Sequence, residues 1–459
     1  MGLKPMKQLP VKKNEYYEVM IEDLTHEGMG VAKVDGYALF IPDVLKGEHV
    51  KIKVVKTKKG FGFGKLVEVM KESPERTEPI CEVYGQCGGC MLQHMSYDEQ
   101  LHFKENLVKN NLERIGHFSN LEVRPIIGMQ DGFYYRNKAQ VPVRMQNEKV
   151  TAGFFRPRSH DIIDMKKCYI QHETNNELIQ IVRDVMEELH IDPYDEEKHR
   201  GVVRHIMTRI GVKTGEVMLV LVTKTQKFPM QEIFVQKMVE RYKGITSIIQ
   251  NVNSKRTNVI LGEKNNLLYG EPTIKDYIGD IQFEISPHSF FQVNPEQTEK
   301  LYREALNAAQ LTGKETVIDA YCGIGTISLF LAKQAKKVYG VEVVPEAIQD
   351  AKRNAKLNEI ENIEFEVGKA EETMGKWKEV NIKADVIVVD PPRKGCDRAL
   401  LDTMIEMKPT RVVYVSCNPA TLARDLRVLA DGGFNVEYVQ PVDMFPQTNH
   451  VECVALMSR

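Results

Sequence analysis

The sequence lacks any long hydrophobic run, and this absence excludes a large class of proteins. A segment that crosses a bilayer needs roughly 18 or more consecutive apolar residues, and no stretch of the 459 residues approaches that length. Residues 1–19 carry positive charge without an apolar segment, so they do not resemble a secretory signal. Internal repeats and low-complexity tracts are also absent. We therefore expect a cytoplasmic protein of two or three folded domains.

The chain has almost no net charge, which excludes a global electrostatic attraction to nucleic acid. Its 62 Lys and Arg residues nearly balance its 64 Asp and Glu residues, for a formal net charge of −2. Any RNA contact must come from a local patch. Residues 51–65 (KIKVVKTKKGFGFGK) form one, with six lysines, no acid, and Phe61 and Phe63 among glycines. The lysines would neutralise phosphates while the phenylalanines offer stacking faces. The alternative is a solvated barrel edge protected by lysines.

Cysteine is scarce, with eight residues in the whole chain, and disulfides are not expected in the cytosol. One group has the spacing of a metal site, C-x5-C-x2-C followed by a distant fourth cysteine: Cys81, Cys87, Cys90 and Cys168. Four thiolates hold either zinc or an iron–sulfur cluster. Zinc ribbons usually pair two C-x2-C knuckles, and only one is present, which favours iron–sulfur. A fourth ligand would close the site, which indicates a structural role rather than radical chemistry.

Three regions differ in their pattern of apolar residues. Residues 14–73 alternate polar and apolar residues in short segments, which is typical of a small five-stranded barrel of the oligonucleotide-binding kind. Residues 76–280 mix strand and helix patterns and form the predicted central domain. Residues 281–459 alternate near-continuous apolar strands with helices, which indicates a parallel sheet covered on both faces. The expected fold class is multidomain α/β.

The predicted strands of residues 281–459 end in features of a nucleoside pocket. The first strand ends in DAYCGIGT, where two glycines allow a close turn, but neither a third glycine nor a phosphate-binding lysine follows. Glu342 ends the second strand, where an acid can accept hydrogen bonds from ribose hydroxyls. Asp390 follows another apolar strand in DPPRKG. Both acids could instead be helix caps. Together they favour a cationic nucleoside such as S-adenosylmethionine over NAD.

Cys417 is the predicted nucleophile. It follows the apolar strand RVVYVS and precedes a helix (PATLARDL), whose dipole we expect to favour the thiolate. Carbon 5 of uracil becomes nucleophilic once a thiolate has added to carbon 6, and a base must then remove the carbon 5 proton. Glu452, in NHVECVAL, is the candidate base, and its alternative is an exposed acid on an edge strand. Cys322, Cys396 and Cys453 are expected to serve packing or solubility.

Five motifs occur in a fixed order between residues 290 and 453: FFQVNPEQ, DAYCGIGT, DPPRKG, SCNP and HVEC. In content and order they resemble the RNA uracil-5 methyltransferase family, and the similarity covers residues 281–459. The resemblance implies a Rossmann-like catalytic domain whose cofactor contacts are Gln292, Tyr321, Glu342 and Asp390. It also implies that Cys417 attacks the base and that Glu452 takes the proton.

The rest of the chain resembles the branch of this family that acts on 23S ribosomal RNA, and most closely its Gram-positive enzymes. Residues 14–73 resemble the TRAM domain of that branch, an RNA-binding barrel. The ligands of its 4Fe–4S cluster match Cys81, Cys87, Cys90 and Cys168. By the same resemblance, residues 98–119 would pack with the catalytic domain, so the central domain would be discontinuous. The expected activity is therefore S-adenosylmethionine-dependent methylation of carbon 5 of specific uridines in 23S ribosomal RNA.

The target carbon lies inside any stacked helix, so the uridine must be single-stranded or flipped out. Candidate RNA contacts in the central region are Arg136, Lys138, Arg156, Arg158 and His160. We expect a monomer without an obligate protein partner. Two alternatives stay open. The barrel and the cysteines argue against a transfer-RNA uridine-5 methyltransferase, and the intact Cys417 and Glu452 argue against a non-catalytic RNA-binding iron–sulfur protein.

Overall fold

The computed structural model describes residues 9–157 and 159–459, so Arg158 lies outside the described residues. The chain divides into two compact units. The first is Met1–Phe103 with Pro446–Asn449, and the second is Lys104–Phe445 with His450–Arg459. Among the described residues, no helix is both long and apolar enough to cross a membrane.

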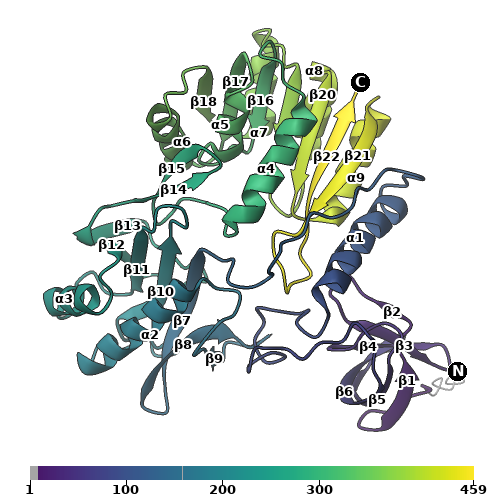
Figure 1. The fold of residues 1–459 in the computed structure, drawn as a ribbon, viewed down its shortest axis with the longest axis vertical. Coiled ribbons are helices and arrows are strands. Elements are labelled where there is room, and N and C mark those ends of the chain that lie inside the picture. The colour runs from purple at the N-terminus through teal and green to yellow at the C-terminus, as the bar shows by residue number, and fades with distance from the viewer. Residues whose placement is uncertain (1–8, 158) are drawn as a thin grey trace, which may run out of the picture. The chain divides into compact units, whose positions relative to one another are not determined.

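The first unit contains a small sheet of six strands in the order β1-β5-β6-β4-β3-β2 (Figure 1). The strands are β1 (Tyr16–Met20), β2 (Asp23–Leu24), β3 (Gly30–Val34), β4 (Tyr37–Ile41), β5 (His49–Thr57) and β6 (Phe61–Lys71). The prediction of five strands was wrong, because β2 has only two residues and is too short to produce an alternating pattern. Alternate residues of β5 are fully buried, among them Val50, Ile52 and Val54. This is the period-2 pattern that predicted the strand.

The second unit begins with a central seven-stranded sheet in the order β13-β12-β11-β10-β7-β8-β9. Its strands are β7 (Lys138–Gln146), β8 (Lys149–Phe155), β9 (Ile162–Asp164), β10 (Val203–Ile210), β11 (Val217–Thr223), β12 (Ile245–Val252) and β13 (Lys264–Gly270). Helices α2 (Glu173–Glu188) and α3 (Gln231–Arg241) share a core with one face of this sheet. The other face packs on the hairpin of β14 (Ile274–Ile278) and β15 (Ile281–Ile285). Every residue of β11 is buried as a result.

The last sheet has seven strands in the order β18-β17-β16-β19-β20-β22-β21. They are β16 (Thr316–Ala320), β17 (Lys337–Glu342), β18 (Ile363–Val367), β19 (Val386–Val389), β20 (Arg411–Ser416), β21 (Asn435–Val442) and β22 (Glu452–Ser458). The sheet is not purely parallel as predicted, because β22 pairs antiparallel with both β20 and β21. A loop rather than a helix connects β21 to β22, and a loop connection suits antiparallel neighbours.

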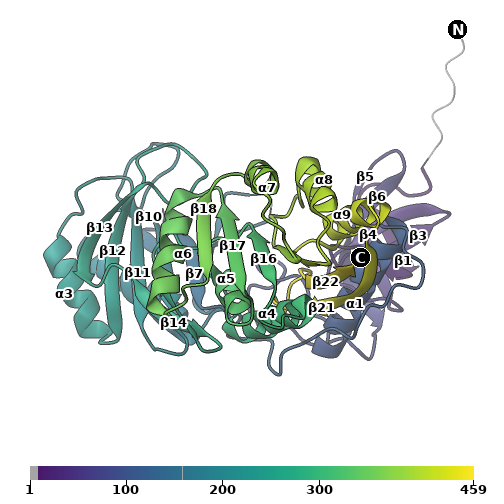
Figure 2. The ribbon, with the colours of Figure 1, turned by 90° about the horizontal axis from the view of Figure 1, so that it is seen from above.

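Helices cover both faces of this last sheet (Figure 2). Residues of α4 (Pro295–Ala309), α5 (Thr326–Ala332) and α6 (Pro345–Leu357) share one core with the sheet. Residues of α7 (Ala370–Glu379), α8 (Arg398–Met407) and α9 (Pro419–Asp431) share the other. Val108 and Leu112, from the part of α1 (Tyr97–Arg114) that belongs to the second unit, lie in this second core. The sheet is therefore shielded from water on both sides, and its strand ends are left to bind ligands.

Candidate active site

A cavity of 840 Å³ opens at the carboxyl ends of the strands of the last sheet. This volume lies in the range of about 300–1,000 Å³ that is typical of small-molecule pockets. The cavity lining includes all the side chains that the sequence analysis assigned to cofactor binding or catalysis: Gln292, Tyr321, Glu342, Asp390, Cys417 and Glu452. Residues that are far apart in the sequence meet here because strands β16, β17, β19 and β20 run parallel and end at one edge.

The turn after β16 forms the floor of the cavity. Tyr321 has a positive φ of 67°, and Gly325 (φ 83°) stands immediately before α5. Ser328, at the position of the missing third glycine, donates a hydrogen bond from its hydroxyl to the Asp319 carboxylate. The other carboxylate oxygen of Asp319 is buried without a hydrogen-bond partner. Burial raises the pKa of Asp319 to about 7, and the carboxylates of Asp390 and Glu342 add to this effect.

Glu342 and Asp390 lie at the rim with different environments. The Glu342 carboxylate accepts hydrogen bonds from the backbone N–H groups of Gly323 (3.3 Å) and Val344 (3.0 Å). Burial raises the pKa of Asp390 to about 6. Neither acid is a helix N-cap, because Val344 holds that position for α6 and Asp397 holds it for α8. The helix-cap alternative for both acids was therefore wrong.

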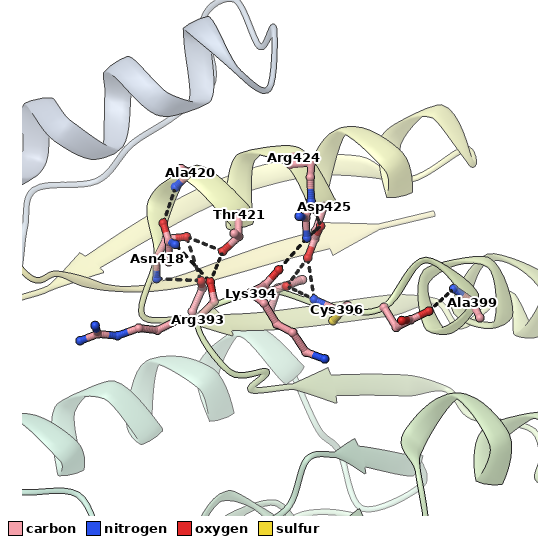
Figure 3. Close-up of polar contacts among 12 residues, drawn as sticks. Arg393, Lys394, Cys396, Ala399, Asn418, Ala420, Thr421, Arg424 and Asp425 are labelled. Carbon is pink, nitrogen blue, oxygen red and sulfur yellow. Dashed lines mark hydrogen bonds and ion pairs between the residues drawn. The ribbon is translucent and has the colours of Figure 1, made fainter. Parts of the chain in front are cut away.

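Hydrogen bonds hold the loop after Asp390 against the start of α9 (Figure 3). The Arg393 carbonyl accepts hydrogen bonds from the Asn418 side-chain amide (3.1 Å) and the Thr421 hydroxyl (3.3 Å). The Asp425 carboxylate accepts a hydrogen bond from the backbone N–H of Cys396 (2.8 Å). The loops that carry Asp390 and Cys417 are therefore joined, so the two side chains keep a fixed separation.

Cys417 and Glu452 face each other across two paired strands. In the antiparallel pair of β20 and β22, Ser416 lies opposite Cys453. The next step along this register places Cys417 opposite Glu452. Glu452 is only 4% exposed, and β22 lies between β20 and β21 rather than at an edge. The alternative of an exposed edge-strand acid was therefore wrong.

Charge and burial oppose ionisation of the Cys417 thiol in the protein alone. Burial and the carboxylates of Glu452 and Asp390 raise the pKa of Cys417 to about 11, against the opposing charge of Arg393. Burial also raises the pKa of Glu452 well above its usual value, with a further contribution from Asp390. Cys417 does directly precede the N-cap of α9, but the helix dipole does not prevail. The sequence predicted that the dipole of the following helix favours the thiolate, whereas burial and the two carboxylates shift the pKa of Cys417 in the opposite direction.

The cavity also contains side chains that the sequence analysis did not assign. Phe290 lines it and is 71% exposed, which is unusual for a large aromatic ring. Phe445 and His450 line it too, with ring centroids 6.2 Å apart, and His450 Nε2 lies 3.4 Å from an Arg393 guanidinium nitrogen. Phe290 and His450 are the first residues of the motifs FFQV and HVEC. Their exposure to a common space could not be predicted from those motifs.

The four cysteines of the predicted cluster are divided between the two units: Cys81, Cys87 and Cys90 belong to the first and Cys168 to the second. The Cys87 sulfur accepts a hydrogen bond from the Gly89 backbone N–H at 3.3 Å. The side-chain amide of Asn176 in α2 holds the backbone of Cys168. Its oxygen accepts a hydrogen bond from the Cys168 backbone N–H (2.8 Å), and its nitrogen donates one to the Cys168 carbonyl (3.0 Å). In residues 9–157 and 159–459, no three His, Cys, Asp or Glu side chains gather in a metal-binding arrangement.

The lysine-rich segment 51–65 lies on β5 and β6 of the first unit. Both are inner strands of the sheet, so the alternative of a protected edge was wrong. Phe61 and Phe63 are half-buried and form a ring cluster with Phe40, with centroids 5.6–6.0 Å apart. Lys58 Nζ lies 5.0 Å from the centre of the Phe61 ring. Aromatic faces beside exposed lysines are the combination that binds single-stranded nucleic acid.

A doubly covered sheet with an acid-lined cavity beyond its strand ends defines the class of this protein, an S-adenosylmethionine-dependent methyltransferase. The family model for tRNA (uracil-5-)-methyltransferase matches residues 96–459, and the model for the TRAM domain matches residues 10–67. The chain belongs to the tRNA (uracil-5-)-methyltransferase family.

Similar proteins extend over nearly the whole chain. An uncharacterized RNA methyltransferase of Halalkalibacterium halodurans is 60% identical over 98% of both chains. One from Bacillus cereus is 56% identical, again over 98% of both. Among solved structures, a Pyrococcus abyssi tRNA (uracil-54, C5)-methyltransferase in complex with S-adenosyl-L-homocysteine has a TM-score of 0.78 and 31% identity. That comparison covers 96% of this chain and 99% of the Pyrococcus chain.

Proposed function

We propose that this protein methylates carbon 5 of uridine in RNA, with Cys417 as the nucleophile and Glu452 as the base. The observation that carries the proposal is that both side chains line one cavity, directly beyond the registered pair Ser416 and Cys453, where burial and the Glu452 carboxylate raise the pKa of the Cys417 thiol. The proposal includes a cytoplasmic, monomeric enzyme with RNA as its macromolecular partner.

The cavity suits a cationic methyl donor. Gln292, Tyr321, Glu342 and Asp390 would contact S-adenosylmethionine, the co-substrate that supplies the methyl group. Two features of the lining support this fit: its acidic side chains and the buried oxygen of Asp319 that has no hydrogen-bond partner. A positively charged ligand would reduce the repulsion between the carboxylates of the lining. Phe290 at 71% exposure offers a flat apolar face at the cavity, where a flipped base could stack.

The residues of the chain would act in three steps. The Cys417 thiolate forms a bond to carbon 6 of uracil, and the electron pair of the 5,6 double bond moves to carbon 5 and the adjacent carbonyl. Carbon 5 then attacks the methyl group of S-adenosylmethionine, and the bond from that methyl group to the sulfonium sulfur breaks, so that S-adenosylhomocysteine leaves. Glu452, ionised at this stage, removes the proton from carbon 5, and the carbon–sulfur bond breaks to restore the double bond and release Cys417 as a thiolate.

We propose 23S ribosomal RNA as the substrate, supported by the resemblance of the TRAM domain and the four cysteines to that branch. Transfer RNA is the second candidate, favoured by the similarity to the Pyrococcus enzyme for uracil 54 of tRNA. Tritium release from RNA labelled at carbon 5 of uridine separates them, because each methylation expels that hydrogen. We expect release from 23S ribosomal RNA and none from transfer RNA. Tritium release from transfer RNA alone would contradict the proposal that 23S ribosomal RNA is the substrate. No release from either RNA would contradict methylation of carbon 5.

The affinity for S-adenosylmethionine should depend on pH through Asp390 and Asp319. Burial raises their pKa values to about 6 and about 7, and a cationic ligand binds the ionised carboxylates better. Binding should release protons, and the affinity should fall by up to about tenfold per pH unit between pH 7 and pH 6 and more steeply below pH 6, where both carboxylates are protonated. Calorimetric titration between pH 5.5 and 8 measures this. S-adenosylhomocysteine, which lacks the sulfonium charge, is the matched ligand, and an equally steep dependence for it would contradict the argument.

We also propose that Cys81, Cys87, Cys90 and Cys168 hold a 4Fe–4S cluster. Support comes from the four-thiol donor set and from the N–H donor of Gly89 to the Cys87 sulfur, because such donors tune cluster sulfurs. Protein purified without oxygen should contain about four irons and four sulfides per chain, and Cys168→Ser should lose both. Stoichiometric zinc without sulfide would refute the cluster.

A further inference from the structure

Three cationic side chains lie together at the start of β7 in the central sheet. Lys138 on β7 and Arg209 on β10 are direct cross-strand partners, so their side chains stand on one face of the sheet. Arg136 lies two residues before Lys138. We call Arg136, Lys138 and Arg209 the cationic cluster. The face that carries it also carries Met207 and is opposite the face covered by α2 and α3.

Arg209 is buried, Arg136 and Lys138 are partly exposed, and none of the three has a counterion among the residues that the structure describes. Arg209 is 5% exposed, and its guanidinium donates to the carbonyls of Pro287 (3.2 Å) and Ser289 (2.6 Å), while its Nε has no partner. Burial, together with the charges of Arg209 and Arg136, lowers the pKa of Lys138 to about 7. Within the described ranges, none of the three cations forms an ion pair.

This arrangement is unfavourable for the protein alone. Like charges directly opposite each other on adjacent strands are destabilising, and a buried charge without a partner costs several kcal/mol by general experience. Side chains that violate packing and pairing rules in this way are typical of functional sites. An anion that enters between the three cations would remove the repulsion and supply the missing hydrogen-bond acceptor.

The cationic cluster adjoins the cavity without lining it. The two carbonyls that Arg209 contacts belong to the segment that continues into Phe290 and Gln292, both of which line the cavity. Asn137, between Arg136 and Lys138, donates from its side chain to the Gln292 carbonyl (3.2 Å). The charge of Arg136 contributes to the lowered pKa of His450, another lining residue. An anion bound there would therefore lie beside the cavity and not within it.

We propose that the cationic cluster binds a backbone phosphate of the RNA, next to the uridine that enters the cavity. A flipped nucleotide stays attached to its strand, so its flanking phosphates must lie just outside the pocket that takes the base. A carboxylate of a small co-substrate would instead lie inside the cavity, where none of the three cations is found. The proposal rests on the proposed function for the identity of the ligand as RNA.

The test compares Lys138→Met with Lys243→Met, which removes an exposed lysine of the same central region. Binding of a fluorescein-labelled RNA hairpin with a uridine in its loop is measured by anisotropy from 50 to 300 mM KCl. We expect Lys138→Met to bind about tenfold more weakly at the lowest salt and to reduce the slope of log K against log salt by about 0.7, the value for one single-strand phosphate. Lys243→Met should match the native protein.

Two further readouts separate this role from a structural one. Removing a positive charge that lies opposite the buried Arg209 without a counterion should leave the melting temperature of Lys138→Met unchanged or raise it, whereas loss of a structural lysine would lower it. The affinity for S-adenosylmethionine should not change. Native affinity and native salt slope in Lys138→Met, or an equal loss in Lys243→Met, would overturn the phosphate site. Failure of the native protein to release tritium would overturn the proposed function. The salt dependence of RNA binding would still show whether the cationic cluster contacts a phosphate.

Discussion

Replacement of Cys417 by alanine is expected to abolish methylation of RNA, with a fall in rate of at least about 1,000-fold, because the nucleophile defines the reaction path. Without a thiol at this position, carbon 5 of uracil keeps its ordinary weak nucleophilicity and the methyl group has no acceptor. Binding of S-adenosylmethionine should persist, since the Cys417 side chain carries no charge in the free protein. Single-turnover transfer of a radioactive methyl group to RNA measures the loss, and calorimetry measures the retained binding.

Covalent trapping distinguishes a nucleophile from a packing residue. In RNA that contains 5-fluorouridine, the base cannot remove fluorine from carbon 5, so the adduct persists and migrates as a protein–RNA complex in denaturing gels. The native protein and Cys453→Ala should both give this complex, because Cys453 is fully buried in β22 next to Glu452. Cys417→Ala should give none. A complex formed by Cys417→Ala would assign the attack to another residue.

The raised pKa of Cys417 has a consequence for when this nucleophile becomes active. At pH 7 a thiol with a pKa of about 11 is almost entirely protonated. Besides burial, two of the causes are the nearby carboxylates of Glu452 and Asp390, and a positive charge in the cavity would offset both. The thiolate would then form chiefly in the complex with the positively charged methyl donor.

The sequence was sufficient to predict the cavity because the strand order follows simple rules. Tyr321, Glu342 and Asp390 each stand where an apolar strand ends, and parallel strands end at a common edge, so these three residues had to meet there. The position of Glu452 was harder to predict. Its strand has no preceding helix, and only the antiparallel insertion of β22 between β20 and β21 buries it opposite Cys417.

Other features depend on contacts between segments that no local pattern links. In the sequence, Arg209 looks like an ordinary polar residue of a strand. Its pairing with Lys138 depends on the register of β7 and β10, which the sequence does not show. The pKa of Cys417 was expected to fall rather than rise because the helix dipole is visible in the sequence, whereas burial and the facing carboxylate are tertiary properties. The ionisation of residues within a site therefore cannot be predicted without the structure, even where every residue of the site has been identified from the sequence.

Glu452→Gln is expected to stop the reaction after methyl transfer and to accumulate a covalent protein–RNA complex. Attack by Cys417 and transfer of the methyl group do not need the base, but expulsion of the thiol requires loss of the carbon 5 proton. Tritium release should fall by at least about 1,000-fold. With a radioactive methyl donor, the label should appear in a complex that resists denaturant, at up to one methyl group per protein chain.

The Glu452→Gln substitution should not destabilise the fold, so a folding defect should not account for the loss of tritium release. Burial raises the pKa of Glu452 well above its usual value, so the neutral glutamine amide matches, in size and charge, the protonated carboxyl that burial favours. We therefore expect a melting temperature close to the native value. Glu361→Gln, an exposed acid in the loop before β18, is the matched control and should release tritium at the native rate. Native tritium release by Glu452→Gln would assign proton removal to a different group. Loss of release without any labelled complex would place Glu452 before methyl transfer, in activation of Cys417 rather than in its departure.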